Sequence, residues 1–205
     1  MDIHLNNLKV FCINLDDRPD RWAEVQEEVK KIGITIERFP AIKHKRGHTG
    51  CILSHIEVWK MAKSLGVWMT IEDDILFLSH PKQNLEKAIK QLPDDWDMLY
   101  LGATLNQPLK QVSKNLLRLQ RGWTTHGIIY NNQNGVVDFI LNGMSDFKVD
   151  VFLTDYVQPK FNCFMCYPMV ATQRPGHSDI LNHYVSYKPI TDRYKRYVTD
   201  IFEQD

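Results

Sequence analysis

The chain has no long hydrophobic run and no excess of charge of either sign. Its 205 residues contain 25 Lys and Arg against 25 Asp and Glu, so the net charge favours neither nucleic acid nor an anionic membrane surface as a partner. No window approaches the ~20 apolar residues that a membrane-spanning helix requires. Residues 1–5 also lack the basic and apolar regions of a secretion signal. We therefore expect a soluble, cytoplasmic protein without a membrane span.

Cysteine is scarce, with four residues in the chain. Cys163 and Cys166 have the C-x-x-C spacing of a zinc or redox site, but they lie in an apolar, strand-like run. A structural zinc site would need a second pair, and Cys12 and Cys51 are isolated in sequence. We expect all four to be free thiols on apolar elements.

The order of apolar and polar segments predicts one α/β domain over residues 1–205, since there is no repeat, low-complexity tract or linker. Residues 8–15 and 34–39 are expected strands on either side of a helix, which predicts a parallel β-α-β unit. Further strands are expected at 67–71, 96–102, 116–119, 125–130, 162–166 and 169–172, and helices at 49–62, 81–92, 133–141 and 184–205. Residues 103–115 and 173–183 are expected to be loops.

An apolar run, residues 67–71, ends abruptly in the three carboxylates of Glu72, Asp73 and Asp74. Three adjacent acids repel one another unless a cation or solvent separates them. Strand alternation sends Glu72 and Asp74 to one side and Asp73 to the other, a spacing that suits a divalent metal and the diphosphate it carries. The alternative is a polar turn after a strand, with Asp74 capping a helix.

Polar residues at the end of the first expected strand are candidates for holding a nucleotide. Asn14, Leu15, Arg18 and Arg21 lie where a nucleotide would dock against a helix N-terminus. Arginine can donate two parallel hydrogen bonds to a phosphate. For Arg21, a solvated charge at a helix end is the equal alternative.

Two further groups are candidates on position. Lys45 and Arg46 lie in a basic loop from which they could reach a diphosphate, although such loops are usually only solvated. Ser54 and His55 lie one turn into the next helix, where helix packing is the alternative explanation for His55.

Several segments, in order, resemble glycosyltransferase family 25, the group of bacterial lipooligosaccharide transferases and collagen galactosyltransferases. The matching pieces span residues 8–180, and the chain resembles the stand-alone domains of bacteria and large viruses. They are Ile13-Asn14-Leu15 with Arg18 and Arg21, Gly50-Cys51-Ile52-Leu53-Ser54-His55, Ile71-Glu72-Asp73-Asp74, Trp96 to Gly102, Val149-Asp150 with Phe152-Leu153, and Ser178-Asp179-Ile180. Residues 125–130 fit the family only loosely, and nothing after Tyr184 matches it.

The resemblance implies a GT-A fold with a mixed, mainly parallel central sheet flanked by helices, and a UDP-sugar as donor. Residues 8–102 would form the nucleotide-sugar half, and residues 116–205 the acceptor side with a C-terminal helix. It also implies that Asp74 binds Mn²⁺ or Mg²⁺, that Glu72 and Asp73 contact the ribose or orient Asp74, and that Ser54 and His55 lie near the nucleotide. His177 is the candidate second metal ligand and would favour Mn²⁺; a surface histidine is the alternative.

The acceptor is expected to be a glycan or a glycosylated protein, as in lipopolysaccharide biosynthesis. An inverting transfer needs a general base near the acceptor hydroxyl. Asp150 is the first candidate because it begins an apolar segment, and Asp155 is the second; either one can instead be a helix N-cap. A retaining reaction would need no such base. The rival functions are a silent glycan-binding module and a metal-dependent phosphate-ester hydrolase.

Overall fold

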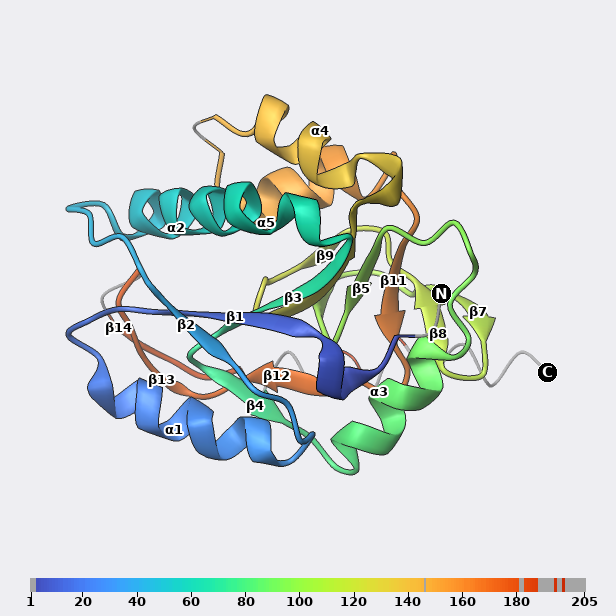
Figure 1. The fold of residues 1–205 in the computed structure, drawn as a ribbon, viewed down its shortest axis with the longest axis horizontal. Helices are drawn as coiled ribbons and strands as arrows, with labels where there is room; N and C mark the ends of the chain where they lie inside the picture. The colour runs from blue at the N-terminus through green and yellow to red at the C-terminus, as the bar shows by residue number, and fades with distance from the viewer. Residues whose placement is uncertain (1–2, 146, 181–182, 188–193, 195–196, 198–205) are drawn as a thin grey trace.

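In a computed structural model the chain forms a mixed β-sheet between two layers of helices (Figure 1). The structure describes residues 3–145, 147–180, 183–187, 194 and 197. Within these described residues, the main sheet has its strands in the following spatial order: β2 (Glu37–Pro40), β1 (Lys9–Asn14), β3 (Val67–Glu72), β10 (Gly127–Asn131), β5 (Met98–Tyr100), β11 (Cys163–Cys166), β8 (Leu116–Arg118) and β7 (Lys110–Ser113).

Strand direction in this sheet is mixed. β2, β1 and β3 are mutually parallel, as are β5 and β11, whereas β10 runs antiparallel between β3 and β5. β8 is antiparallel to both β11 and β7, so all of these described strands except β10 and β8 share one direction. The predicted α/β class with a mixed, mainly parallel sheet is therefore confirmed, and so is the parallel pairing of the first β-α-β unit.

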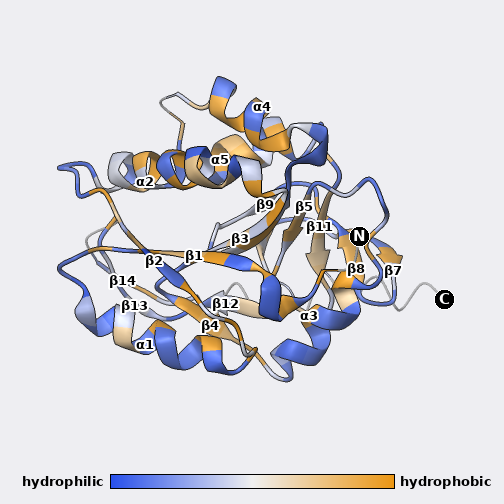
Figure 2. Ribbon diagram, viewed as in Figure 1, coloured by the Kyte–Doolittle hydropathy of each residue, from blue (hydrophilic) through white to orange (hydrophobic). Residues whose placement is uncertain are grey.

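The helices cover both faces of the sheet (Figure 1). They are α1 (Pro19–Lys30), α2 (Gly47–Ala62), α3 (Pro81–Ile89), α4 (Val136–Gly143) and α5 (Val149–Phe152). On β1 and β3, Phe11 and Trp68 point into the core beneath α2, α4 and α5, whereas Cys12 and Met69 point into the core above α1 and α3. Strand alternation divides the apolar residues in this way, and Figure 2 shows the outer sides of α1 and α3 as largely hydrophilic.

The four cysteines are free, and Cys12, Cys163 and Cys166 are buried, as predicted. Cys163 belongs to the core under α2 and α4, whereas Cys166 belongs to the core on the opposite face of the sheet. The two thiols of the C-x-x-C sequence therefore cannot bind one metal ion.

Short elements complete the described fold. Three small sheets pair β4 (Ile75–Phe77) with β12 (Ala171–Gln173), β13 (Gly176–Ser178) with β14 (His183–Val185), and β6 (Thr104–Leu105) with β9 (Gly122–Trp123). Short helical turns lie at Leu5–Asn7, Lys63–Leu65, Asn132–Asn134 and Leu153–Val157.

The predicted loops and two predicted helices need correction. Residues 103–115 contain β6 and β7, and residues 173–183 contain β13, because their strand partners lie elsewhere in the sequence. The helix expected at 133–141 begins only at Val136, since Gly135 has the left-handed φ of 75°. Of the helix expected at 184–205, residues 188–193, 195–196 and 198–205 lie outside the described residues. Residues 184 and 185 belong to β14.

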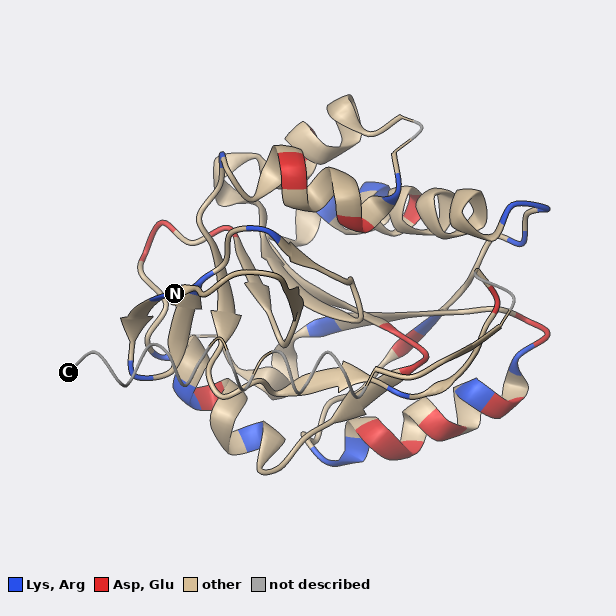
Figure 3. Cartoon of the chain, turned by 180° about the vertical axis from the view of Figure 1, so that it is seen from behind, with Lys and Arg blue, Asp and Glu red and all other residues tan. Residues whose placement is uncertain are grey.

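Acidic and basic groups meet where β1 and β3 end. Figure 3 shows acidic residues along α1 and between β3 and β4, with basic residues in the loop before α2. Among the residues that the structure describes, none of the helices is both long and apolar enough to cross a bilayer.

Candidate active site

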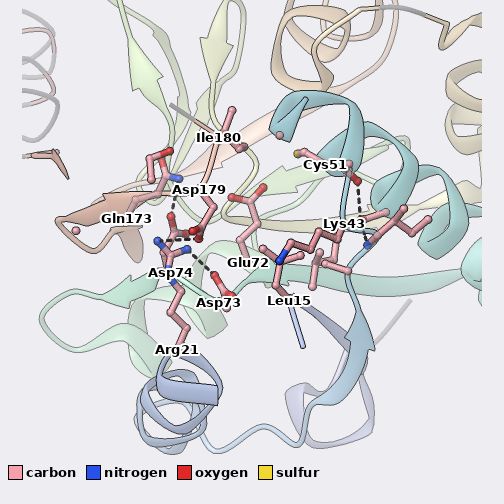
Figure 4. Close-up of a pocket in the computed structure, with 18 of the residues that line it drawn as sticks. Leu15, Arg21, Lys43, Cys51, Glu72, Asp73, Asp74, Gln173, Asp179 and Ile180 are labelled. Atoms are coloured by element: carbon pink, nitrogen blue, oxygen red, sulfur yellow. Dashed lines mark hydrogen bonds and ion pairs between the residues drawn. The ribbon is translucent and has the colours of Figure 1, made fainter. Parts of the chain in front are cut away.

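A pocket of about 320 Å³ lies at the carboxyl ends of β1 and β3. Its walls come from the end of β1, the start of α1, the loop before α2, the first turns of α2, the turn after β3, residues in 173–180, and Tyr187. Ligand crevices of open α/β sheets occur at this edge, because parallel strands deliver their carboxyl ends together. Figure 4 shows the three predicted carboxylates between Arg21 on one side and Cys51 on the other.

The acidic residues form a tight turn between two strands. β3 ends at Glu72, Asp73 and Asp74 form the turn, and β4 begins at Ile75. The alternative in which Asp74 caps a helix is therefore wrong. Each carboxylate has its own set of partners, and these differ in charge and burial.

Asp73 is held by residues of the first β-α-β unit. Its carboxylate accepts a 2.7 Å hydrogen bond from Asn14 Nδ2 and one of 3.0 Å from an Arg21 guanidinium nitrogen. The side chains of Arg21 and Asp73 are 15% and 10% exposed. Burial raises the pKa of Asp73, although Asn14 and Arg21 act against that shift. Arg21 therefore neutralises a buried acid.

Replacing Arg21 by Ala should lower the free energy of unfolding by about 2 kcal/mol at pH 7, because it leaves a buried carboxylate without its cation. The deficit should shrink as the pH falls towards ~4, since protonation of Asp73 removes the uncompensated charge. Urea unfolding at pH 7 and pH 5 measures this, with Arg21→Lys as the control that keeps the charge. An equal deficit at both pH values would show that Arg21 acts through contacts other than its pair with Asp73, such as its hydrogen bond to His177 O.

Glu72 faces α2 and the segment just before β10. Its Oε1 lies 3.3 Å from His55 Nε2 and accepts a 2.5 Å hydrogen bond from Thr125 Oγ1. Burial opposes ionisation of Glu72, but the hydrogen bonds from His55 and Thr125 outweigh it and hold the pKa below its ordinary value. Glu72 is therefore a stable carboxylate at neutral pH.

Of the three carboxylates, Asp74 is the one with a buried oxygen that accepts no hydrogen bond. Its Oδ2 accepts a 3.2 Å hydrogen bond from Gln173 Nε2, whereas its Oδ1 is buried and has no hydrogen-bond partner in the structure. Burial, followed by the charges of Glu72 and Asp73, raises the pKa of Asp74 to about 8. A divalent cation would satisfy the free oxygen and offset the repulsion, so these residues fit the ion that the resemblance implies.

Some of the other residues predicted to bind the nucleotide line the pocket, and others do not. Leu15 and Ser54 line the pocket. The Ser54 hydroxyl donates to Gly50 O and accepts from Ile42 N at 2.8 Å, so it ties the loop before α2 to the helix. Arg18 pairs with Asp20 and, at 2.6 Å, with Asp179, and it is not among the residues that line the pocket.

Lys45 and His177 are exposed and do not line the pocket. In β13 the neighbours Gly176 and Ser178 line it, so strand alternation turns His177 away. The basic loop instead contributes Lys43, which forms an ion pair with Asp17.

Asp150 lies in the first turn of α5, after the N-cap Lys148. Its Oδ1 accepts a 2.9 Å hydrogen bond from Val151 N, so it stabilises the helix start without being the N-cap residue. Burial, opposed by that bond and aided by the charge of Glu72, raises the pKa of Asp150. Asp155 instead lies in the π-helical turn Leu153–Val157. Its side chain is 39% exposed, and its carboxylate lies 3.7 Å from a guanidinium nitrogen of Arg121.

Sequence reasoning missed several residues of the pocket, chiefly Gln173, Asp179 and Tyr187. Asp179 belongs to the Ser178-Asp179-Ile180 segment that carried part of the resemblance, and that was the available signal. Gln173 and Tyr187 have no local pattern that marks them.

Known proteins are similar in sequence to this chain. The family profile described as glycosyltransferase family 25 (LPS biosynthesis protein) matches residues 45–139. The chain is 29% identical over 147 residues to the putative glycosyltransferase R655 of Acanthamoeba polyphaga mimivirus, covering 60% of this chain and 45% of that protein. It is 29% identical over 159 residues to human procollagen galactosyltransferase 2, covering 59% of this chain and 25% of that protein.

A Drosophila melanogaster glycosyltransferase 25 family member is 26% identical over 164 residues, covering 62% of this chain and 27% of that protein. The chain thus spans less than half the length of these curated relatives. A solved glycosyltransferase involved in glycosylation of the PBCV-1 major capsid aligns with a TM-score of 0.49 and 7% identity, over 77% of this chain and 80% of that one. The matched profile and relatives confirm the resemblance to glycosyltransferase family 25 that the ordered motifs predicted.

Proposed function

We propose that this chain transfers a hexose from a UDP-sugar to a glycan or a glycosylated acceptor, with the help of a divalent ion. The observation that carries the proposal is Asp74, a half-buried carboxylate with one free oxygen and a pKa of about 8 beside two further acids. Carboxylates crowded in this way favour a bound cation. The resemblance to glycosyltransferase family 25 supports the choice of a nucleotide sugar over other phosphate-containing ligands.

In the proposed site, Asp74 would hold Mn²⁺ or Mg²⁺, and Glu72 would orient it or contact the ribose. The ion would act as a Lewis acid that neutralises charge on the donor's diphosphate. Asn14 and Arg21 keep Asp73 in place, and Leu15 adds an apolar surface beside it. His177 and Lys45 are left out of this site because they face solvent.

Asp150 is the proposed general base of an inverting transfer. Burial, aided by the charge of Glu72, raises the pKa of Asp150 and so makes it a stronger base than an exposed aspartate. Residues 8–102 would bind the donor and residues 116–205 would face the acceptor, within one domain. The cytoplasmic location stays a prediction.

Calorimetry with UDP and Mn²⁺ tests the proposal. We expect UDP to bind with Mn²⁺ present and to bind at least ~10-fold more weakly in EDTA, since the ion offsets the charge of both the acids and the diphosphate. GDP is the control nucleotide. Binding of a glycan without UDP would instead favour a silent binding module, and phosphate-ester hydrolysis without UDP binding would favour a hydrolase.

A further inference from the structure

One wall of the pocket contains a group of metal-ligating side chains other than Asp74. Cys51 and His55 are four residues apart on α2, so they share one face of that helix. That face meets the end of β3, where Glu72 lies. Ligand atoms of Cys51, His55 and Glu72 all lie within 4.8 Å of one another.

These three side chains are buried or half-buried but remain open to the pocket. His55 is 1% exposed, and its Nδ1 has no hydrogen-bond partner in the structure. Its other ring nitrogen lies 3.3 Å from Glu72 Oε1. Tetrahedral ligands of one Zn²⁺ ion lie roughly 3.3–3.8 Å apart, given Zn–ligand distances of ~2.0–2.3 Å. Small side-chain rotations would thus bring all three onto one ion.

The charge around the thiol also favours a cation. Burial, followed by the charges of the Glu72, Asp150 and Asp74 carboxylates, raises the pKa of the Cys51 thiol, and a cation bound there would offset those three charges. Of the four cysteines, all within the described residues, Cys51 is the one that lines the pocket. Cys12, Cys163 and Cys166 are fully buried in the cores.

We propose that Cys51, His55 and Glu72 form a second cation site that takes a zinc-like transition ion. A thiolate, an imidazole and a carboxylate suit Zn²⁺ or Co²⁺, whereas Mn²⁺ and Mg²⁺ prefer oxygen ligands. Three protein ligands leave a fourth position open to the pocket. The site does not depend on the transferase reaction, but an ion there would engage Glu72 and so change the donor pocket.

Cobalt absorption spectroscopy tests the site directly. We expect one equivalent of Co²⁺ to produce visible bands of tetrahedral Co²⁺ and a near-ultraviolet thiolate-to-cobalt band. One equivalent of Zn²⁺ should remove them, and excess Mg²⁺ should not. Cys51→Ser should abolish the thiolate band and weaken Zn²⁺ binding at least ~100-fold, and Glu72→Gln should weaken it at least ~10-fold. Cys163→Ala, the matched control, should behave like the wild type.

A second measurement needs no variant. Zn²⁺ should protect Cys51 of the wild-type protein from alkylation, as followed by mass spectrometry of its peptide. The proposal is overturned if no thiolate band forms, if the band survives in Cys51→Ser, or if Zn²⁺ leaves alkylation of Cys51 unchanged. Failure of the proposed transferase function would show separately, as absent Mn²⁺-dependent UDP binding, and would leave the cobalt spectrum unaffected.

Discussion

Replacing Asp74 by Asn is expected to lower UDP-sugar turnover by about 10³-fold or more while the fold survives. The variant loses the free carboxylate oxygen that would hold the divalent ion, and with it several kcal/mol of stabilisation of the leaving diphosphate. Turnover is measured as hydrolysis of a panel of UDP- and GDP-sugars, which needs no acceptor and also identifies the donor. Mn²⁺ should raise the melting temperature of the wild type and leave that of the variant unchanged.

The same variant should be more stable than the wild type at alkaline pH. The pKa of Asp74 is about 8 in the folded chain, against ~4 for an exposed aspartate. Ionisation is therefore harder in the folded state, and this residue makes the wild type lose stability as the pH rises from ~4 to ~8. Relative to the wild type, the free energy of unfolding of the variant should be about 1–2 kcal/mol higher at pH 8 and less so at pH 5. This figure is discounted for solvent screening.

Asp94→Asn is the matched control, because it removes the same charge from an exposed position. It should leave both turnover and the pH dependence of stability unchanged. Full activity in Asp74→Asn would refute the metal-binding role. A stability difference that did not grow with pH would refute the raised pKa.

Replacing Asp150 by Asn is expected to lower kcat by about 10²–10⁴-fold and to leave Mn²⁺-dependent UDP affinity unchanged, if Asp150 is the general base of an inverting transfer. The amide keeps the size and the hydrogen bond with Val151 N but cannot accept the acceptor's proton. In the wild type, the acidic limb of the kcat/KM profile should lie above the range of an ordinary carboxyl, because the pKa of Asp150 is raised.

Asp155→Asn serves as the comparison for that experiment. Asp155 is exposed and lies beside Arg121, so its loss should change kcat by less than about 3-fold. A large loss in Asp155→Asn with none in Asp150→Asn would transfer the base role to Asp155. Normal rates in both variants would favour a retaining reaction, which needs no base.

The first β-α-β unit and the acidic turn could be predicted because their signals are local. The apolar run of β1 ends at Asn14 and that of β3 ends at Glu72, and parallel strands bring these ends together. The hydrogen bond from Asn14 to Asp73 is a direct result of that pairing, although 59 positions separate the two residues.

Other parts of the site could not be predicted, because their partners are distant and no local period marks them. Gln173 reaches Asp74 from 99 positions away, and Asp179 reaches Arg18 from 161. β13 was expected to be loop because three residues, Gly176–Ser178, are too few to show alternation. The orientation of His177 could not be predicted either. The pairing of this short strand decides which of its residues point inward, and the sequence does not show that pairing.

The sequence by itself determined the α/β class, the resemblance to glycosyltransferase family 25, and the position of three carboxylates at a strand's end, because apolar periodicity and motif order are written along the chain. Only the tertiary structure decided how those carboxylates differ. Arg21 neutralises Asp73, His55 and Thr125 hydrogen-bond Glu72, and Asp74 retains a free oxygen. Adjacent residues of one chemical type acquire different ionisation only through the distant groups that folding brings against them.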